Sequence, residues 1–572
     1  MTEPAPRRGV IQLSDPVNRF LRTGARSILI VAIVVFLAQW RLGRLPHVSD
    51  GGALTQQFLG PVQLTLLGIV GLGLIVSFRW LAPAAVLIAF SGSGMAVLSG
   101  FQYELPFPVF VFLAFLAPAV MLWLAWQGRE TVAKIAVLAV STGALLAGAW
   151  LGSAAIWNHY LGPTHPESTR VPLLDSFVEW VWVGAVDTDG FTVTARMSEP
   201  STSLRLIVTD QSGREVARTE PATIPGDQLD TPVRVTVDDL EPATEYRYRF
   251  ESEGIADEVR AGTVTTFPDG AASLRIAFGA CARTGTNGVV FDAILGVDPD
   301  LYVITGDIHY RDIGKNDEDR FASAYDGVHE SPARSALYRS VPIAYVWDDH
   351  DYGRNDSDSK SASRPAAWAT YRTHVPHYDL PVGSDGSIQQ AFTIGRVRVV
   401  MLDTRSHRLE SDGTLLGSEQ LEWLKAELLA ARDTHALTVL VTPTAWIGAP
   451  EAGADHWGAF ASERAGIGSF LADNAIDNVV LVGGDAHMVA IDDGSNSGYG
   501  GHDGFPVLQA AALDRRGSVK GGPYSHGTFP GGGQFGIVEV TDDGGDQIDV
   551  ELIGLDWEGE LLTSLETSFA VP

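Results

Sequence analysis

The sequence predicts a multidomain protein with an N-terminal α-helical transmembrane bundle, a β-sandwich and a C-terminal α/β domain. Three observations support this division. Long uncharged apolar runs fill residues 1–160, short alternating runs separated by turns fill residues 171–268, and apolar strands alternate with helical stretches over residues 273–572. A chain of 572 residues is also too long for a single hydrophobic core.

Charge is distributed unevenly between these parts. Residues 1–160 hold ten of the 40 basic and five of the 69 acidic residues, so the remainder carries a net charge of about −34. Such a field repels polyanions, which argues against nucleic-acid binding through a basic surface. The sequence gives no sign of an obligate protein partner, and its single cysteine, Cys281, excludes an intramolecular disulfide.

The N-terminal part contains five apolar runs close to the roughly 20 residues that a bilayer-spanning helix needs. Basic residues gather before the first run and in two of the connections, which places the N-terminus inside the cell. Five spans then end outside, so we expect a multi-pass protein of the cell membrane, with the lipid bilayer as a partner and the C-terminal domain extracytoplasmic. Buried helices of a globular core are the alternative. The expected spans are residues 27–40, 62–78, 81–98, 107–126 and 132–157.

The middle part has the pattern of a small β-sandwich. Residues 179–186 and 191–196 alternate in polarity and flank Asp187-Thr-Asp-Gly190, a hairpin signal. The segment Leu240-Glu-Pro-Ala-Thr-Glu-Tyr246 resembles the fibronectin type III pattern, in which a tyrosine hydroxyl braces the corner of the sandwich. We expect a spacer or scaffold here, and a carbohydrate- or partner-binding module is the alternative.

In the C-terminal part, polar motifs follow directly after apolar strands. We expect strands at residues 274–278, 301–305, 343–347, 397–402, 437–441 and 478–482, and helices at 287–295, 319–339, 362–374, 418–432 and 462–474. Since α/β sheets bind ligands at the carboxyl ends of their strands, these motifs should converge. They read Phe278-Gly-Ala-Cys281, Gly306-Asp-Ile-His-Tyr310, Trp347-Asp-Asp-His-Asp351, Asp403-Thr-Arg405 and Gly484-Asp-Ala-His487.

The residue types in these motifs indicate a metal site. Cys281 would otherwise be a small core residue and Asp307 a turn cap. The adjacent carboxylates of Asp348 and Asp349 repel each other and need a cation or solvent to neutralise them. Asp485 and His487 are spaced so that, on a strand, they face the same way.

The order of the motifs resembles the alkaline phosphatase D (PhoD-like) family of the calcineurin-like metallophosphoesterase superfamily, over about residues 171–572. The five apolar N-terminal runs are not part of the usual family pattern. Ala280 and Asp351 depart from the family's serine and glutamate. The resemblance implies an α/β metallophosphoesterase domain and a metal-dependent phosphatase or phosphodiesterase acting on small phosphate esters. It also implies iron and calcium as cofactors.

Carried onto this chain, the resemblance assigns the ligands. Asp307 would bridge the two metals and Asp349 would complete the calcium site, with Asp348 and Asp351 as further candidates. A thiolate and a phenolate are good donors to ferric iron, which independently favours iron over zinc. His309, one position from Tyr310, is a possible substitute ligand. The implied iron ligands are Cys281, Asp307, Tyr310, Asp485 and His487.

Two further residues are assigned catalytic roles. His350 could protonate the leaving oxygen or hold a phosphate oxygen, and Arg405 could clamp the phosphate. A salt bridge from Arg405 to Asp403 is the alternative for that residue. A non-catalytic phosphate or metal receptor and a structural cell-surface adhesion protein are the alternatives for the whole chain.

Overall fold

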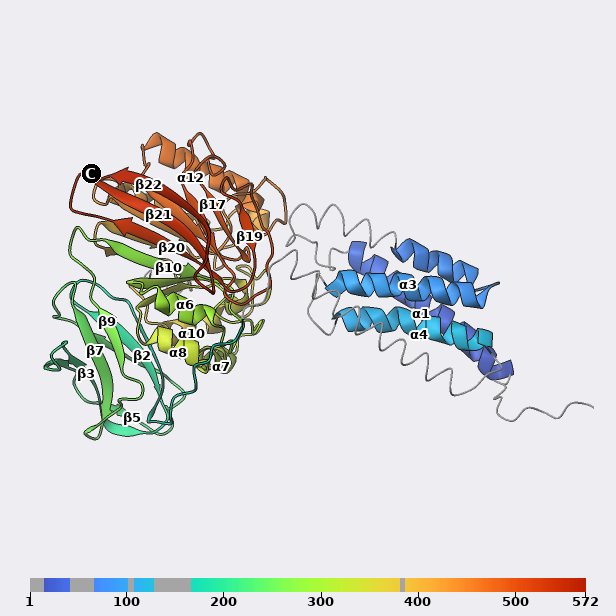
Figure 1. Ribbon diagram of the computed structural model, residues 1–572, viewed down its shortest axis with the longest axis horizontal. Helices are drawn as coiled ribbons and strands as arrows, with labels where there is room; N and C mark the ends of the chain where they lie inside the picture. The colour runs from blue at the N-terminus through green and yellow to red at the C-terminus, as the bar shows by residue number, and fades with distance from the viewer. Residues whose placement is uncertain (1–14, 42–65, 101–106, 128–165, 381–385) are drawn as a thin grey trace, which may run out of the picture. The chain divides into compact units, whose positions relative to one another are not determined.

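The computed structural model describes residues 15–41, 66–100, 107–127, 166–380 and 386–572. The chain divides into two compact units, Met1–Tyr160 and Leu161–Pro572 (Figure 1). The described residues of the first unit are helical, and the second unit contains the sheets.

The described part of the first unit consists of α1 (Asp15–Arg41), helical residues 66–76, α3 (Leu81–Gly100) and α4 (Phe107–Gln127). Their apolar side chains bury one another: Leu29, Val70, Ile88 and Phe115 are all at most 2% exposed within one cluster. The helices therefore form a small core of their own.

Among the described residues, no helix combines the length and apolar character needed to cross a bilayer. The predicted N-terminal transmembrane bundle is therefore wrong, and so is the multi-pass membrane localisation with an extracytoplasmic domain that rested on it. The physical reason is that an apolar run serves helix–helix packing as well as membrane crossing, and these runs pack on one another. The expected span at residues 132–157 and the start of that at 62–78 lie outside the described residues.

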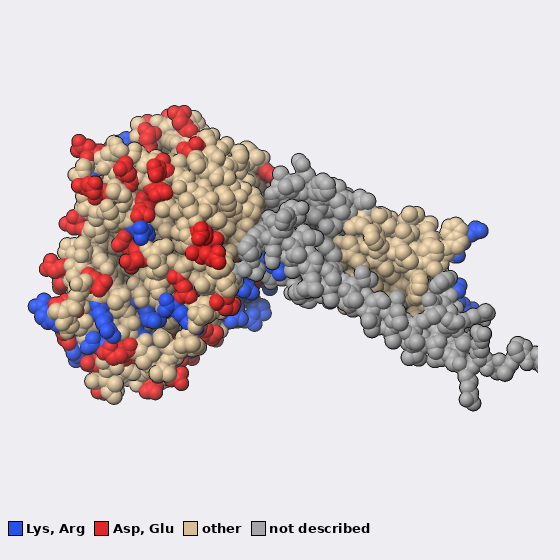
Figure 2. Space-filling model, viewed as in Figure 1, with Lys and Arg blue, Asp and Glu red and all other residues tan. Residues whose placement is uncertain are grey.

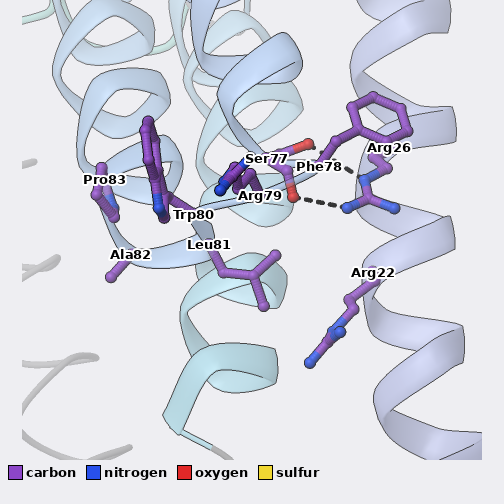
Figure 3. A pocket seen from close by; sticks show the side chains of 9 residues that line it. All are labelled: Arg22, Arg26, Ser77, Phe78, Arg79, Trp80, Leu81, Ala82 and Pro83. Carbon is purple, nitrogen blue, oxygen red and sulfur yellow. Dashed lines mark hydrogen bonds between the residues drawn. The ribbon is translucent and has the colours of Figure 1, made fainter.

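A short turn joins helical residues 66–76 to α3 and forms a pocket of about 260 Å³ with α1 (Figure 3). Arg26 of α1 donates hydrogen bonds to the Ser77 carbonyl oxygen at 2.6 Å and to Ser77 Oγ at 3.2 Å. Its guanidinium also lies 4.1 Å from the centre of the Phe78 ring. These contacts fix α1 against the turn.

The second unit is built on three sheets. The largest has nine strands, in which β10, β11 and β12 are parallel and β20 runs antiparallel to β10. Figure 1 shows β22, β21, β20 and β10 side by side. In spatial order the strands are β22 (Leu561–Ala570), β21 (Gln547–Asp556), β20 (Gln534–Thr541), β10 (Leu274–Gly279), β11 (Leu301–Thr305), β12 (Ile343–Val346), β1 (Val178–Gly184), β2 (Phe191–Met197) and β6 (Val233–Val237).

The second sheet has seven strands with a parallel centre, and it shares one apolar core with the first sheet. All residues of β14, β15 and β16 except Arg398 are buried, as expected of strands covered on both faces. The order is β13 (Gln390–Ile394), β14 (Val397–Met401), β15 (Leu437–Thr442), β16 (Val479–Gly483), β18 (Val507–Ala510), β17 (Met488–Asp492) and β19 (Thr528–Pro530).

The third sheet comprises β4 (Glu215–Arg218), β3 (Ser201–Thr209), β7 (Glu245–Ser252) and β8 (Ile255–Ala256), with β5 (Ala222–Ile224) on β3 and β9 (Gly262–Thr265) on β7. It faces β1, β2 and β6 across a shared core. The Tyr246 hydroxyl accepts a hydrogen bond from the Glu241 N–H at 3.0 Å, the corner contact that the sequence pattern predicts.

One face of this sandwich belongs to the nine-stranded sheet. β1 pairs in parallel with β12 through Gly184 and Ile343. A Cβ at Gly184 would lie 2.3 Å from the Ile343 carbonyl oxygen, so only glycine allows this approach. The middle part of the chain therefore adds β1, β2 and β6 to the same sheet whose strands β10, β11 and β12 lead into the polar motifs.

Helices occupy the connections close to where the sequence predicts them. The predicted helix at 319–339 is divided in two because Pro332 starts a new helix, with Ser331 as its N-cap. The helices are α6 (Val290–Gly296), α7 (Glu318–His329), α8 (Pro332–Tyr338), α9 (Asp349–Tyr352), α10 (Arg364–His374), α11 (Gly417–Arg432) and α12 (Ala461–Asp473), with 3₁₀ turns η1 (Glu410–Asp412) and η2 (Trp457–Phe460).

His329, the last residue of α7, lies inside the core. Its ring stacks on Trp180 with centroids 4.2 Å apart, and neither ring nitrogen has a hydrogen-bond partner among the described residues. Burial, together with the nearby positive charge of Arg334, holds the pKa of His329 well below its ordinary value. The folded protein therefore keeps this ring neutral.

Acid should destabilise the protein through His329. In the unfolded chain the ring takes up a proton below about pH 6.5, whereas in the folded chain it does not, so the stability falls as the pH falls below that value. At pH 5 this one residue should cost about 2 kcal/mol. His329→Phe should remove this contribution to the loss of stability between pH 7.5 and pH 5. Thermal unfolding of the variant and the wild type at both pH values would measure it. An equal loss of stability on acidification in both proteins would contradict the prediction.

Candidate metal centre

The polar motifs converge at the carboxyl ends of the central strands. Cys281 follows β10, Asp307 follows β11, Asp349 follows β12, and Asp485 and His487 follow β16 of the other sheet. Four of these residues adopt left-handed backbone conformations, with φ of 63° at Cys281, 56° at Asp307, 61° at Asp485 and 43° at His487. Left-handed conformations are uncommon in residues other than glycine, and they cluster at functional sites.

Gly306 allows two of the strand ends to meet. Its φ is +101°, and a Cβ there would lie 2.5 Å from the Cβ of Asp348. The Gly-Asp pair of the second motif thus brings Asp307 close to the third motif, as only glycine can.

Asp307 lies at the centre of the site. It belongs to both groups of potential ligands that the described residues form, one with Asp349 and His350 and one with Asp348 and Asp485. Within each group the ligand atoms lie within 4.8 Å of one another. The side chain is 1% exposed. A carboxylate shared by two ligand groups is the arrangement that a bridging ligand requires.

Cys281, Tyr310 and His487 lie on one side of Asp307. The Cys281 Sγ is 3.7 Å and the Tyr310 hydroxyl 2.6 Å from Asp307 Oδ2, and the same hydroxyl is 3.3 Å from His487 Nε2. Burial and the neighbouring carboxylates raise the pKa of both the thiol and the phenol, so each holds its proton until a cation replaces it. The structure therefore brings the sulfur, phenol, imidazole and carboxylate donors together.

The donor set fits a cation. Asp348 Oδ2 and Asp485 Oδ2 are buried and have no hydrogen-bond partner among the described residues. Burial raises the pKa of Asp485, with Asp455 adding to the effect, and burial raises that of Asp348 to about 7 against the opposing charge of Arg405. A buried carboxylate oxygen without a hydrogen-bond partner is costly, and a bound metal ion would satisfy it.

Asp349 and Asp351 differ in their surroundings. Asp349 is grouped with Asp307 and accepts the backbone N–H of Asp356. Asp351 instead accepts bonds from the Asp348 N–H at 2.6 Å and the Tyr345 hydroxyl at 2.6 Å. Asp349 is therefore placed to bind a cation, whereas Asp351 shapes the loop.

His350 is held beside the carboxylates. Its ring Nδ1 is 2.6 Å from Asp312 Oδ1, and its backbone N–H donates to Asp307 Oδ1 at 3.2 Å. The centroid of its ring lies 4.1 Å from that of Tyr310. Burial alone would lower its pKa, but Asp349, Asp307 and Asp312 outweigh burial and raise the pKa to about 10. The imidazole is thus oriented through Nδ1.

Arg405 is fully buried and pairs with Asp348 through Nε, with Nη2 3.9 Å from Asp349. Neither Nη1 nor Nη2 has a hydrogen-bond partner among the described residues. The alternative salt bridge to Asp403 does not form, because Asp403 accepts the Trp347 indole N–H and the backbone N–H of Arg405, both at 3.0 Å. The terminal nitrogens of Arg405 are therefore buried beside the carboxylates with their hydrogen-bonding capacity unused among the described residues.

Some assignments differ from expectation. His309 is fully buried against Phe321 and Tyr325, so it packs in the core. Asp312, which orients His350, and Lys520, which contacts Asp485 at 2.9 Å, were missed by sequence reasoning. Both lie outside the motifs, and no local pattern marks them.

Comparison with known proteins agrees with this geometry. Residues 276–509 match the profile of a family described as PhoD-like phosphatase. The solved structure of PhoD is similar with a TM-score of 0.55 and 19% identity, over 71% of this chain and 92% of that one. A purple acid phosphatase, PPD1 from yellow lupin (Lupinus luteus) seeds, is similar with a TM-score of 0.50 and 12% identity, over 69% and 74%. No curated protein sequence matches the chain.

At these identities the two structures establish the fold alone, and the family profile adds the activity. Neither the profile nor the described helices support the membrane region. The matched profile and the buried ligand groups support a metal-dependent hydrolase of phosphoric esters, in which residues 276–509 match the PhoD-like phosphatase family model.

Proposed function

We propose that this chain hydrolyses small phosphate monoesters or diesters at a centre that would hold iron and calcium. The single observation that supports two cations is Asp307, which is common to two ligand groups. Asp349 would hold calcium with Asp307, and Asp348 lies in the other ligand group, with Asp307 and Asp485. Iron would be held by Cys281, Asp307, Tyr310, Asp485 and His487.

The donor types support this division. Sulfur and phenol oxygen are the donors that ferric iron accepts, whereas calcium prefers carboxylate oxygen. When bound, two such cations acidify a water molecule and neutralise the charge on phosphoryl oxygens. The Cys281 Sγ lies 3.7 Å from Asp307 Oδ2 among the ligands, so the thiol would be occupied as a metal ligand and would not act as a nucleophile.

The chain's own residues would bind and orient the ester. Arg405 would donate its two unpartnered Nη groups to phosphoryl oxygens, held rigidly by its pairing with Asp348. His350, fixed by Asp312, would place a proton near the leaving oxygen through Nε2.

The surface of the larger unit supports a small substrate. Figure 2 shows many Asp and Glu side chains on its visible face. Such a surface repels nucleic-acid backbones at long range. The complete ligand set also argues against a non-catalytic receptor or an adhesion protein, since neither needs every donor in place.

Metal removal should abolish activity. We expect the purified chain to hydrolyse p-nitrophenyl phosphate or its bis ester, and treatment with a chelator to lower the rate by at least about 10³-fold. Elemental analysis should find iron and calcium, and phenolate bound to ferric iron should give a visible charge-transfer band. Unchanged rates after complete metal removal would contradict the proposal, and zinc without iron would contradict the metal assignment.

A further inference from the structure

A buried chain of three charges connects Asp485, a motif residue, to Lys520 and Asp455, which lie outside the sequence motifs. Lys520 Nζ donates to Asp455 Oδ2 at 2.6 Å and to Asp485 Oδ1 at 2.9 Å. The three residues are only 7%, 7% and 5% exposed. They come from three separate connections, after β15, β16 and β18. Buried charges of this kind are retained at a cost and need a reason.

The segment that carries Lys520 is fixed to the ligand turn. The Ser518 N–H donates to the His487 carbonyl oxygen at 3.1 Å, and the Gly522 N–H donates to the Ile447 carbonyl oxygen at 3.1 Å. Gly521 has φ +67°, and a Cβ there would lie 2.0 Å from the same Ile447 oxygen. The direction of Lys520 is therefore set by backbone contacts on both sides.

The contact with Lys520 makes the two carboxylate oxygens of Asp485 different from each other. Oδ1 accepts the ammonium, whereas Oδ2 is buried without a hydrogen-bond partner among the described residues. A carboxylate can bind a cation through one oxygen or both. With Oδ1 occupied, Oδ2 is the oxygen available to a cation, on a side chain that already lies with Asp307 and Asp348.

Asp455 serves as the counterion of the lysine. Its Oδ2 accepts the ammonium, and its Oδ1 lies 3.9 Å from the guanidinium of Arg408. Removing Asp455 would take away one of the two carboxylates that the ammonium contacts. With Asp455 present, the ammonium is held between two carboxylates.

We propose that Lys520 is a positioning residue that fixes Asp485 for one-oxygen metal binding through Oδ2, with Asp455 holding the lysine in place. This inference rests on the proposed metal centre. It concerns how tightly and in what geometry the cation is held, because Lys520 would contact the metal only through Asp485. Ligand-orienting partners of this kind typically change metal affinity by about 10- to 100-fold.

The test compares four variants of the full chain with the wild type. Lys520→Met leaves Asp455 buried without its ammonium partner, so it could fail to fold. The double variant Asp455→Asn/Lys520→Met removes both charges, and Lys520→Arg keeps a cationic donor. Lys425→Met, which removes a lysine paired with Glu422 on the surface of α11, is the matched control.

The readouts are iron content after dialysis against graded chelator, the position of the visible band, and kcat with KM. We expect the double variant to fold, to lose iron at about 10- to 100-fold lower chelator concentration, and to show a shifted band. Lys520→Arg should restore most of the affinity, and Lys425→Met should match the wild type.

A double variant that folds and holds iron as tightly as the wild type, with an unchanged band, would overturn the inference while leaving the proposed function intact. A wild type that binds no cation would overturn both. Metal content thus separates the two failures without relying on activity.

Discussion

Asp307→Asn should eliminate metal binding at both positions and lower kcat/KM by at least about 10³-fold. Asp307 is the one side chain common to both ligand groups, so its loss affects two cations together. The amide keeps the size of the side chain but cannot offer two anionic oxygens. Elemental analysis and p-nitrophenyl phosphate hydrolysis measure the two effects.

Asp351→Asn provides the contrasting control. Asp351 is equally buried, but its oxygens accept bonds from Tyr345 and backbone N–H groups and it belongs to neither ligand group. We expect this variant to lose thermal stability and to keep its metal content. Metal loss in Asp351→Asn with retention in Asp307→Asn would reverse the assignment of the two carboxylates.

Arg405→Lys should lower kcat/KM by about 10²- to 10³-fold while leaving the metal content unchanged. The guanidinium has two buried Nη groups without hydrogen-bond partners in the part of the chain that the structure describes, and an ammonium cannot present that fork to a phosphate. Lysine keeps a positive charge beside Asp348, so the fold is less affected than by a neutral residue.

Steady-state rates together with phosphate inhibition measure this effect. We expect the affinity for inorganic phosphate to fall with kcat/KM, because both depend on the same donors. Wild-type rates in a folded, metal-loaded Arg405→Lys protein would show that Arg405 only neutralises Asp348.

Much of the α/β domain follows from local pattern. Predominantly apolar runs such as Leu301–Thr305 predict buried parallel strands, and the motif after each run predicts convergence at their carboxyl ends. The donors in these motifs are therefore placed together by the topology. The division of the predicted helix at Pro332 also has a local cause, the capping signal of Ser331.

Contacts between distant segments were not predictable in this way. Nothing near Lys520 in the sequence marks it as a partner of Asp485, because the pairing depends on three connections meeting. The partner of Arg405 is Asp348, 57 residues away, although Asp403 is the nearer acid in sequence. Long-range pairing is set by packing, which a motif does not encode.

The sequence by itself determined the donor types, their order and their position after the strands, because alternation and apolar runs specify strands locally. Only the tertiary structure decided that β1 continues the nine-stranded sheet through Gly184 and that Asp307 belongs to two ligand groups. It also decided that the apolar N-terminal runs bury one another. The physical reason is that an apolar run requires burial without specifying its partner, and the partner is chosen by the fold as a whole.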